Sequence, residues 1–225
     1  MNSNSTFPSL VVIIRHGEKP GNPANDDKGG MNLSILGSAR AAALPSLFTP
    51  NPVTTPVTTL MQPSCGVAQG QSAQFTGTYS SSGLTVGPPL LPVPNFLFAT
   101  KQSSNSNRPY ETIVPLSQAL PGAPISIDNS YSDKHYADLA AEILTTNPAK
   151  YANQVVLICW HHGKIPELAE AFKVPKPEMK NYDPWPATVF DIIFQITWTN
   201  GQAALAIGYQ KLLFGDSASE KNLQS

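Results

Sequence analysis

The stretch Leu10–Glu18, LVVIIRHGE, decides the fold. Its first five residues are apolar without alternation, which predicts a short strand buried on both faces of a parallel sheet. Arg15, His16 and Gly17 follow at the carboxyl end of that strand, where ligands bind in open α/β sheets. An arginine beside a histidine, with a glycine that lets the backbone turn, suits an anion held next to a nucleophile or proton carrier. The alternative is a strand capped by ordinary loop residues.

Two further apolar runs end in similar residues. Gln154–Trp160 predicts a buried strand and is followed by two histidines and a glycine at residues 161–163. Asn95–Thr100 predicts another strand, and after a polar turn Arg108 stands at the expected start of a helix, whose backbone N–H groups already favour an anion. Two of the three arginines in the chain therefore stand at strand-to-helix corners, and the planar guanidinium matches phosphate oxygens two at a time.

The remaining periodic segments complete an α/β pattern. Leu33–Leu44 predicts a helix, and Ser132–Thr146 predicts an amphipathic one. Asn200 and Gly201, placed between two apolar runs, predict an antiparallel hairpin. We therefore expect an α/β three-layer sandwich, with a mostly parallel sheet flanked by helices and an antiparallel hairpin near the C-terminus.

Several finer expectations concern single positions. Ser34 is the expected N-cap of the first helix, and Arg40 is expected on the surface of that helix. We expect a short strand at Pro124–Ile127 and the first strand of the hairpin at Thr188–Trp198. The tail from Gly215 onward is expected to fray.

The length of the chain fits one domain that carries an insertion. The 225 residues suffice for a single α/β domain over residues 1–225. Within residues 49–95, 26 of 47 residues are Pro, Gly, Ser or Thr, which is too long a stretch for a plain connection. We interpret it either as a partly ordered insertion or lid, or as a structureless excursion.

The composition disfavours several classes of function. The net charge of −1 points neither to nucleic acid nor to an anionic membrane surface. The two cysteines, Cys65 and Cys159, predict neither a disulfide framework nor a structural zinc site. The polar residues 1–7 and the short apolar run after them fit neither a secretory signal nor a membrane span, so we expect a cytoplasmic protein.

Four motifs, in this order, resemble the histidine phosphatase superfamily, whose fold is phosphoglycerate-mutase-like. They are Arg15-His16-Gly17 after the first strand, Leu33–Ala41, Arg108 with Thr112 at the start of a helix, and His162-Gly163 after a later strand. Together they cover most of the chain outside the insertion and are far more specific than any one of them.

The resemblance implies a metal-independent phosphomonoesterase that needs no cofactor. His16 would attack phosphorus and become a phosphohistidine, which water then hydrolyses. Arg15, Arg108 and His162 would surround the phosphate oxygens, where the charge of the transition state is spread. The partner implied is a small phosphorylated substrate, and the sequence indicates neither its identity nor the oligomeric state.

The leaving oxygen needs a proton, and one branch of the family supplies it from an Asp directly after the second histidine, where this chain has Gly163. Asp133 is our first candidate for this general acid and Glu18 the second. The alternatives are that Asp133 is only a charge at a helix N-terminus, and that Glu18 pairs with Lys19 or Lys164.

Three other hypotheses about the function remain open. Phosphoglycerate mutases carry Ser or Thr and then Trp-Asn after this motif, whereas Lys19–Asn22 reads KPGN, which favours a phosphatase over a mutase-type phosphotransferase. The unassigned acid allows a phosphate- or phosphopeptide-binding module with little turnover. A metal site from His161, His162 and Asp183 is the third hypothesis, although we expect His161 to be a partly buried histidine hydrogen-bonded to backbone.

Two lysines near the expected pocket bear on the charge of the substrate. Lys19 and Lys164 would suit a substrate with additional negative charge, although surface lysines are common.

Overall fold

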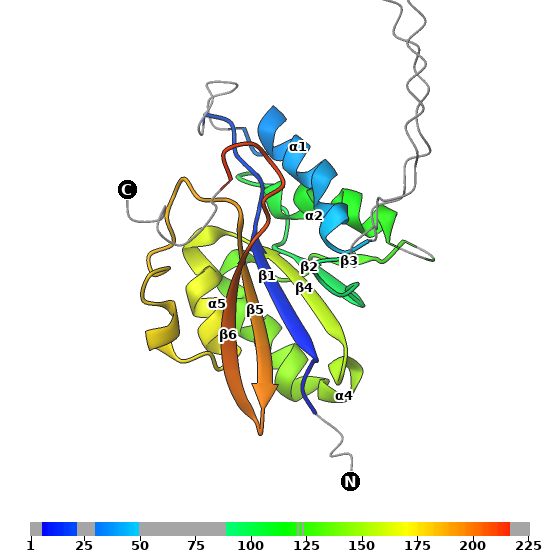
Figure 1. Ribbon diagram of the computed structural model, residues 1–225, viewed down its shortest axis with the longest axis vertical. Helices are drawn as coiled ribbons and strands as arrows, with labels where there is room; N and C mark the ends of the chain where they lie inside the picture. The colour runs from blue at the N-terminus through cyan, green and yellow to red at the C-terminus, as the bar shows by residue number, and fades with distance from the viewer. Residues whose placement is uncertain (1–5, 22–29, 50–88, 121, 123, 217–225) are drawn as a thin grey trace, which may run out of the picture.

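The computed structural model describes residues 6–21, 30–49, 89–120, 122 and 124–216. Within these residues a six-stranded sheet runs in the order β3-β2-β4-β1-β5-β6 (Figure 1). The strands are β1 (Leu10–Arg15), β2 (Phe96–Ala99), β3 (Ile127–Asp128), β4 (Val155–Trp160), β5 (Ile192–Thr199) and β6 (Gln202–Tyr209). The first four are mutually parallel, and β5 and β6 are antiparallel to their neighbours. The predicted α/β class with a C-terminal hairpin is thereby confirmed.

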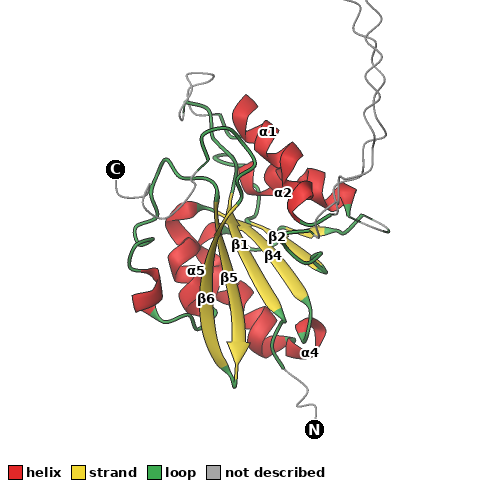
Figure 2. Cartoon of the chain, viewed as in Figure 1, coloured by secondary structure: helices red, strands yellow, loops and turns green. Residues whose placement is uncertain are grey.

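Helices lie on both faces of this sheet (Figure 2). They are α1 (Ile35–Ala43), α2 (Arg108–Ala119), α3 (Tyr136–Ala141), α4 (Pro148–Tyr151) and α5 (Ile165–Ala171). Short 3₁₀ turns lie at Leu44–Leu47, Asp133–His135, His162–Lys164 and Lys176–Met179, and a π turn lies at Glu142–Thr146. Among the described residues, no helix has both the length and the apolarity needed to cross a bilayer.

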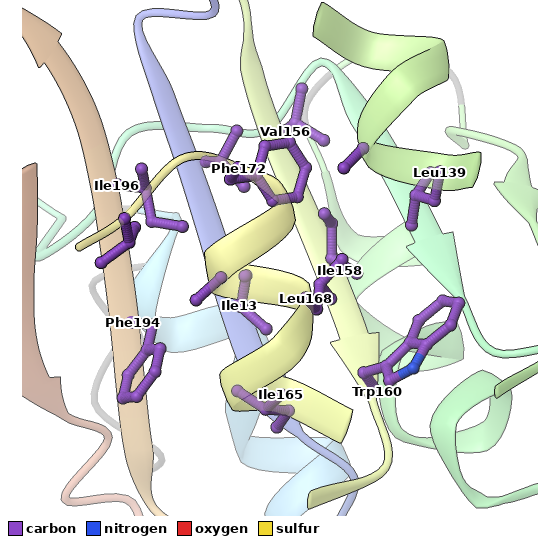
Figure 3. Close-up of a cluster of buried hydrophobic side chains, with 14 of the residues drawn as sticks. Ile13, Leu139, Val156, Ile158, Trp160, Ile165, Leu168, Phe172, Phe194 and Ile196 are labelled. Atoms are coloured by element: carbon purple, nitrogen blue, oxygen red, sulfur yellow. The ribbon is translucent and has the colours of Figure 1, made fainter. Parts of the chain in front are cut away.

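Two hydrophobic clusters separate the three layers. On one face, Ile13 of β1 and Ile158 of β4 pack against Leu168 of α5 (Figure 3). On the other face, Val12 and its neighbours on the strands pack against Ile113 of α2. Adjacent residues of β1 thus enter opposite clusters while both are fully buried, as the unalternating apolar run predicts.

The hairpin turn is confirmed, but its first strand begins later than predicted. Asn200 and Gly201 both have positive φ, at 52° and 79°, as a two-residue hairpin turn requires. Strand β5 starts at Ile192 rather than at Thr188, because the preceding residues turn over the end of β1 and bond to Arg15.

The segment predicted as one helix at Ser132–Thr146 consists of three helical pieces. A 3₁₀ turn closes where His135 N–H donates to the carbonyl of Ser132 at 2.8 Å. Helix α3 follows, and a π turn ends it where Asn147 N–H donates to Glu142 O at 3.0 Å. Pro148 cannot supply a further N–H to the ladder, so the helix stops there. The short strand predicted at Pro124–Ile127 lies instead at Ile127–Asp128.

Most of the insertion lies outside the residues that the structure describes. Of residues 49–95, residues 50–88 lie outside the described residues, so neither interpretation of the insertion is tested. At its far end Leu91 is buried and its N–H donates to Leu47 O at 2.9 Å. Asn95 then pairs with the backbone of Val155 and leads into β2.

Candidate functional site

His16 lies at the carboxyl end of β1, in the middle of the sheet. Its N–H donates to Trp160 O at 3.2 Å, which sets it beside the end of β4. Its ring Nδ1 lies 2.6 Å from Gly17 O. A carbonyl only accepts, so Nδ1 carries the hydrogen and the lone pair belongs to Nε2. Burial lowers the pKa of His16 well below 6.5, so the ring is neutral at neutral pH.

The turn after His16 fits closely against α1. A Cβ at Gly17 would lie 2.9 Å from Gly37 O, and a Cβ at Gly37 would collide with the backbone of Glu18. Ser34 is the N-cap of α1, as predicted, since its Oγ accepts from Gly37 N–H at 3.0 Å. The N–H of Ser34 donates to Glu18 O at 3.0 Å. The two glycines therefore allow α1 to hold the backbone that follows the histidine.

Thr112 connects the same turn to α2. Its hydroxyl accepts from Gly17 N–H at 2.9 Å and donates to Arg108 O at 2.8 Å. Both bonds use one side chain, which is 1% exposed. The first turn of α2, which carries Arg108, is thereby fixed relative to the residue after His16.

Arg108 reaches the loop before α1. Its Nη1 donates to Gly30 O at 2.7 Å, and its Nε is buried without a hydrogen-bond partner among the described residues. Burial lowers the pKa of Arg108, and Glu111 partly opposes that shift. Among the described residues, Arg108 Nε is therefore a buried donor that remains available to a ligand.

Arg15 is held by the residues that precede β5. Its Nη1 donates to the carbonyls of Pro186, Ala187 and Val189 at 3.2, 2.8 and 2.8 Å. Its guanidinium carbon lies 3.6 Å from the centre of the Phe190 ring. Burial lowers the pKa of Arg15 to about 9, so the side chain stays charged at neutral pH.

Sequence reasoning missed this arrangement of residues 186–190. Phe190 also packs edge-to-face on His16, with the ring centres 6.2 Å apart. One aromatic side chain thus contacts both residues of the Arg-His pair. An aromatic residue directly before the hairpin was the available signal, but nothing local relates it to β1.

Of the two histidines after β4, His161 lies beside His16, and His162 lies within the field of Arg15 and Arg108. The ring of His161 meets that of His16 edge-to-face at 5.2 Å, and the described residues provide its ring with no hydrogen bond to backbone, contrary to our expectation. The Nδ1 of His162 is buried without a described partner. Burial, with Arg108 acting on His161 and Arg15 on His162, lowers the pKa of each to about 4.

These side chains form a cluster suited to an oxyanion. We define the His16 cluster as Arg15, His16, Arg108, His161 and His162. At neutral pH its charge comes from two guanidinium groups. The Nε atoms of Arg15 and Arg108 and the Nδ1 of His162 are buried polar atoms without described partners, and each can donate to an anion.

Asp133 begins the 3₁₀ turn before α3. Its carbonyl accepts from Trp160 Nε1 at 3.4 Å, and its Oδ1 is buried without a described partner. Burial raises the pKa of Asp133, with Lys164 opposing and Glu167 adding to the shift. The protonated form that a general acid needs is thereby favoured, although the charges that act most on Asp133 belong to α5 and the turn before it, not to the His16 cluster.

Glu18 is paired with Arg40, which corrects two expectations. Arg40 is 3% exposed rather than on the helix surface, and it donates to Glu18 at 2.6 to 3.1 Å. Glu18 therefore bonds neither Lys19 nor Lys164. Lys164 pairs with Glu167 at 2.7 Å, while Lys19 is exposed and lowers the pKa of His162.

The hypothesis of a metal site is not supported. Among the described residues no group of three or more His, Cys, Asp or Glu side chains could hold a metal ion, so His161, His162 and Asp183 do not form one.

Comparisons with known proteins agree with the fold. No protein-family model matches the chain, and no curated protein matches it. Among solved structures, phosphoserine phosphatase of Entamoeba histolytica with 3-phosphoglyceric acid is similar, with a TM-score of 0.51 and 11% identity over 91% of this chain and 99% of that one. A histidine-to-alanine mutant of that phosphatase with phosphoserine gives a TM-score of 0.49, 10% identity and the same coverage.

A protein assigned as the phosphohistidine phosphatase SixA of Agrobacterium tumefaciens gives a TM-score of 0.45 and 15% identity over 89% of this chain and 97% of that one. The likeness to the phosphoserine phosphatase structure with 3-phosphoglyceric acid shows that the chain shares its fold. The resemblance carried by the four motifs is confirmed at the level of that fold.

Proposed function

We propose that the protein is a metal-independent phosphomonoesterase that works through a phosphohistidine at His16. The observation that carries this proposal is the contact of His16 Nδ1 with Gly17 O at 2.6 Å. It leaves the Nε2 lone pair as the nucleophile on a ring that burial keeps neutral. A nucleophile of this kind next to two guanidinium groups suits attack on a phosphate monoester.

In the first step, Nε2 of His16 attacks phosphorus and the bond from phosphorus to the leaving oxygen breaks. The leaving oxygen takes a proton from Asp133, whose raised pKa favours the acid form. Arg15, Arg108 and His162 bind the phosphate oxygens, and His161 packs edge-to-face on the ring of His16. The products of this step are the free alcohol and a phosphohistidine.

In the second step, water attacks the phosphohistidine and the N–P bond breaks. Asp133, now ionised, accepts the proton of the attacking water, by microscopic reversibility of its first role. Inorganic phosphate leaves, and His16 returns to its neutral form held by Gly17 O.

We take the substrate to be a small phosphorylated compound. The similar Entamoeba histolytica structures hold phosphoserine and 3-phosphoglyceric acid, which are compounds of this class. The KPGN sequence at Lys19–Asn22 favours hydrolysis over mutase-type phosphate transfer.

One observation favours a second candidate, a phosphate- or phosphopeptide-binding module with little turnover. Asp133 interacts mainly with Lys164 and Glu167 rather than with the His16 cluster. If the carboxyl group does not reach the leaving oxygen, the His16 cluster would bind phosphate without efficient hydrolysis.

Release of p-nitrophenol from p-nitrophenyl phosphate between pH 5 and 8 separates the two candidates. The phosphatase proposal predicts turnover that survives EDTA and is lost in His16→Ala. Orthovanadate binding without turnover at any pH would favour the binding module. Turnover that persists in His16→Ala would exclude His16 as the nucleophile.

A further inference from the structure

A buried ion-pair network joins the turn after His16 to the end of the described chain. Arg40 on α1 donates from Nε and Nη2 to Glu18, and from Nη1 and Nη2 to Asp216 at 3.0 and 2.7 Å. The three side chains are 3 to 7% exposed. One guanidinium thus bridges two carboxylates that are 198 residues apart in the sequence.

Asp216 also organises the segment that follows β6. Its Oδ2 accepts from the N–H groups of Leu212 and Leu213 at 2.8 and 3.0 Å. Arg40 holds the pKa of the Asp216 carboxyl below its usual value, despite burial. Gly215 and Asp216 are therefore anchored, so the expectation of a frayed tail is wrong for these two residues, and the rest of the tail lies outside the described residues.

The segment begins at Gln210, which hydrogen-bonds to Phe190, the residue whose ring packs on Arg15. Gln210 N–H donates to Asp191 O at 2.7 Å, and its side-chain Nε2 donates to Phe190 O at 3.2 Å. Phe190 is the ring that contacts both Arg15 and His16. We define residues 210–216 as the C-terminal strap, since they connect Phe190 at one end with Arg40 at the other.

The strap also makes an apolar contact, since Leu212 is partly buried against the cluster that contains Val12 and Ile113. A cavity of about 260 Å³ lies between the strap, α1 and the residues before β5, and its lining includes Glu18, Phe190 and Asp216. The side chain of Phe214 is fully exposed. The strap is therefore held by the Leu212 contact, by the ion pair of Asp216 with Arg40 and by the hydrogen bonds of Gln210.

We propose that Asp216 is a positioning residue for His16, acting through Arg40 and Glu18 on the turn that holds the nucleophile. This inference rests on the proposed function, because its rate prediction needs a catalytic His16. The physical reason is the bridge itself. Without the Asp216 carboxylate, Nη1 and Nη2 of Arg40 lose the acceptor that they share. The guanidinium then re-orients toward Glu18 and shifts the backbone that follows His16.

The test is Asp216→Asn, which keeps an oxygen for the N–H groups of Leu212 and Leu213 but removes the charge that holds Arg40. Glu170→Gln is the matched control, since it also replaces a carboxylate by an amide, in a pair with the exposed Lys176 far from His16 in the sequence. Because misplacing a reactive group by about 1 Å can cost 10²-fold in rate, we expect kcat of Asp216→Asn to fall about 10-fold with KM nearly unchanged. Hydrogen exchange of the backbone amides of residues 16–18 should become faster.

A second variant separates positioning from stability. Arg40→Gln leaves two buried carboxylates unpaired and should lower the melting temperature strongly. The triple variant Glu18→Gln, Arg40→Gln, Asp216→Asn removes those charges together, so its melting temperature should recover while its kcat stays low. Recovery of kcat along with stability would overturn the proposal.

The exchange measurement keeps this inference separate from the proposed function. A parent protein without turnover would refute the proposed function, whereas faster exchange at residues 16–18 in Asp216→Asn would still support the structural link. Exchange and kcat equal to those of Glu170→Gln would refute the positioning role of Asp216.

Discussion

The hydroxyl of Thr112 accepts a hydrogen bond from the backbone N–H of Gly17 at 2.9 Å. The two residues are 95 positions apart and belong to α2 and to the turn after β1. Through this bond the helix that carries Arg108 and the turn that carries His16 form one unit. A hydroxyl can play this part because it accepts from Gly17 while donating to Arg108 O.

Replacement of Thr112 should therefore weaken both fold and activity. Thr112→Val leaves the Gly17 N–H buried without a partner, which costs about 1 to 3 kcal/mol of unfolding free energy. We expect a lower urea midpoint together with reduced kcat. Thr112→Ser retains the hydroxyl and should restore kcat more fully than stability. Equal kcat in the two variants would contradict the role of the hydroxyl.

Replacement of Phe190 should weaken anion binding. Its ring lies 3.6 Å beneath the Arg15 guanidinium, and a cation–π contact contributes about 0.5 to 2 kcal/mol. Phe190→Leu should therefore weaken orthovanadate binding by about 2- to 30-fold in a calorimetric titration. Phe96→Leu is the control, because Phe96 packs on Tyr151 away from the His16 cluster. A similar loss in both variants would argue against a specific effect.

Substitution of Gly37 should disturb the turn after His16. A Cβ at this position collides with the backbone of Glu18, so α1 or the turn must shift. We expect Gly37→Ala to lower the free energy of unfolding by about 1 to 3 kcal/mol, as overpacking does elsewhere. Gly163→Ala is the stability control, since a Cβ there meets nothing within 4 Å. A melting temperature for Gly37→Ala equal to that of Gly163→Ala would contradict the close contact.

The free energy of unfolding should fall as the pH is lowered from about 6.5 toward 4, because His161 and His162 resist protonation in the folded state. The pKa of His161 and of His162 is about 4 in the fold and 6.5 in an unperturbed chain. Between those values the unfolded state binds more protons, so their contribution is complete above pH 6.5 and lost as the pH drops toward 4.

Unfolding titrations across this range in the parent and in His162→Asn would test the expectation. The variant should show a shallower pH dependence, by about one proton, because one titrating group has been removed. An unchanged slope would show that His162 titrates alike in both states.

The central architecture was predictable because its signals are local. The apolar runs at Leu10–Ile14 and Gln154–Trp160 identified buried parallel strands, and Asn200-Gly201 identified the hairpin turn. The resemblance to the histidine phosphatase superfamily implied that the residues after those strands share one site, and the carboxyl ends of parallel strands do lie at one end of a sheet. The structure places His16, His161 and His162 at that end.

What sequence reasoning missed depends on contacts between distant segments. The carbonyls that hold Arg15 belong to residues 171 to 174 positions away, and their backbone conformation follows from the loop as a whole. Arg40 was expected on the surface of its helix. The buried partners Glu18 and Asp216 come from two other parts of the chain, and no local pattern indicates them.

The most direct test of the central claim is detection of the phosphorylated intermediate. The protein would be mixed with a labelled phosphomonoester, quenched in alkali within milliseconds and mapped by mass spectrometry. The proposed mechanism predicts an alkali-stable, acid-labile phosphoryl group on His16, absent from His16→Ala. Turnover without any label on His16, or with the label on another residue, would contradict it.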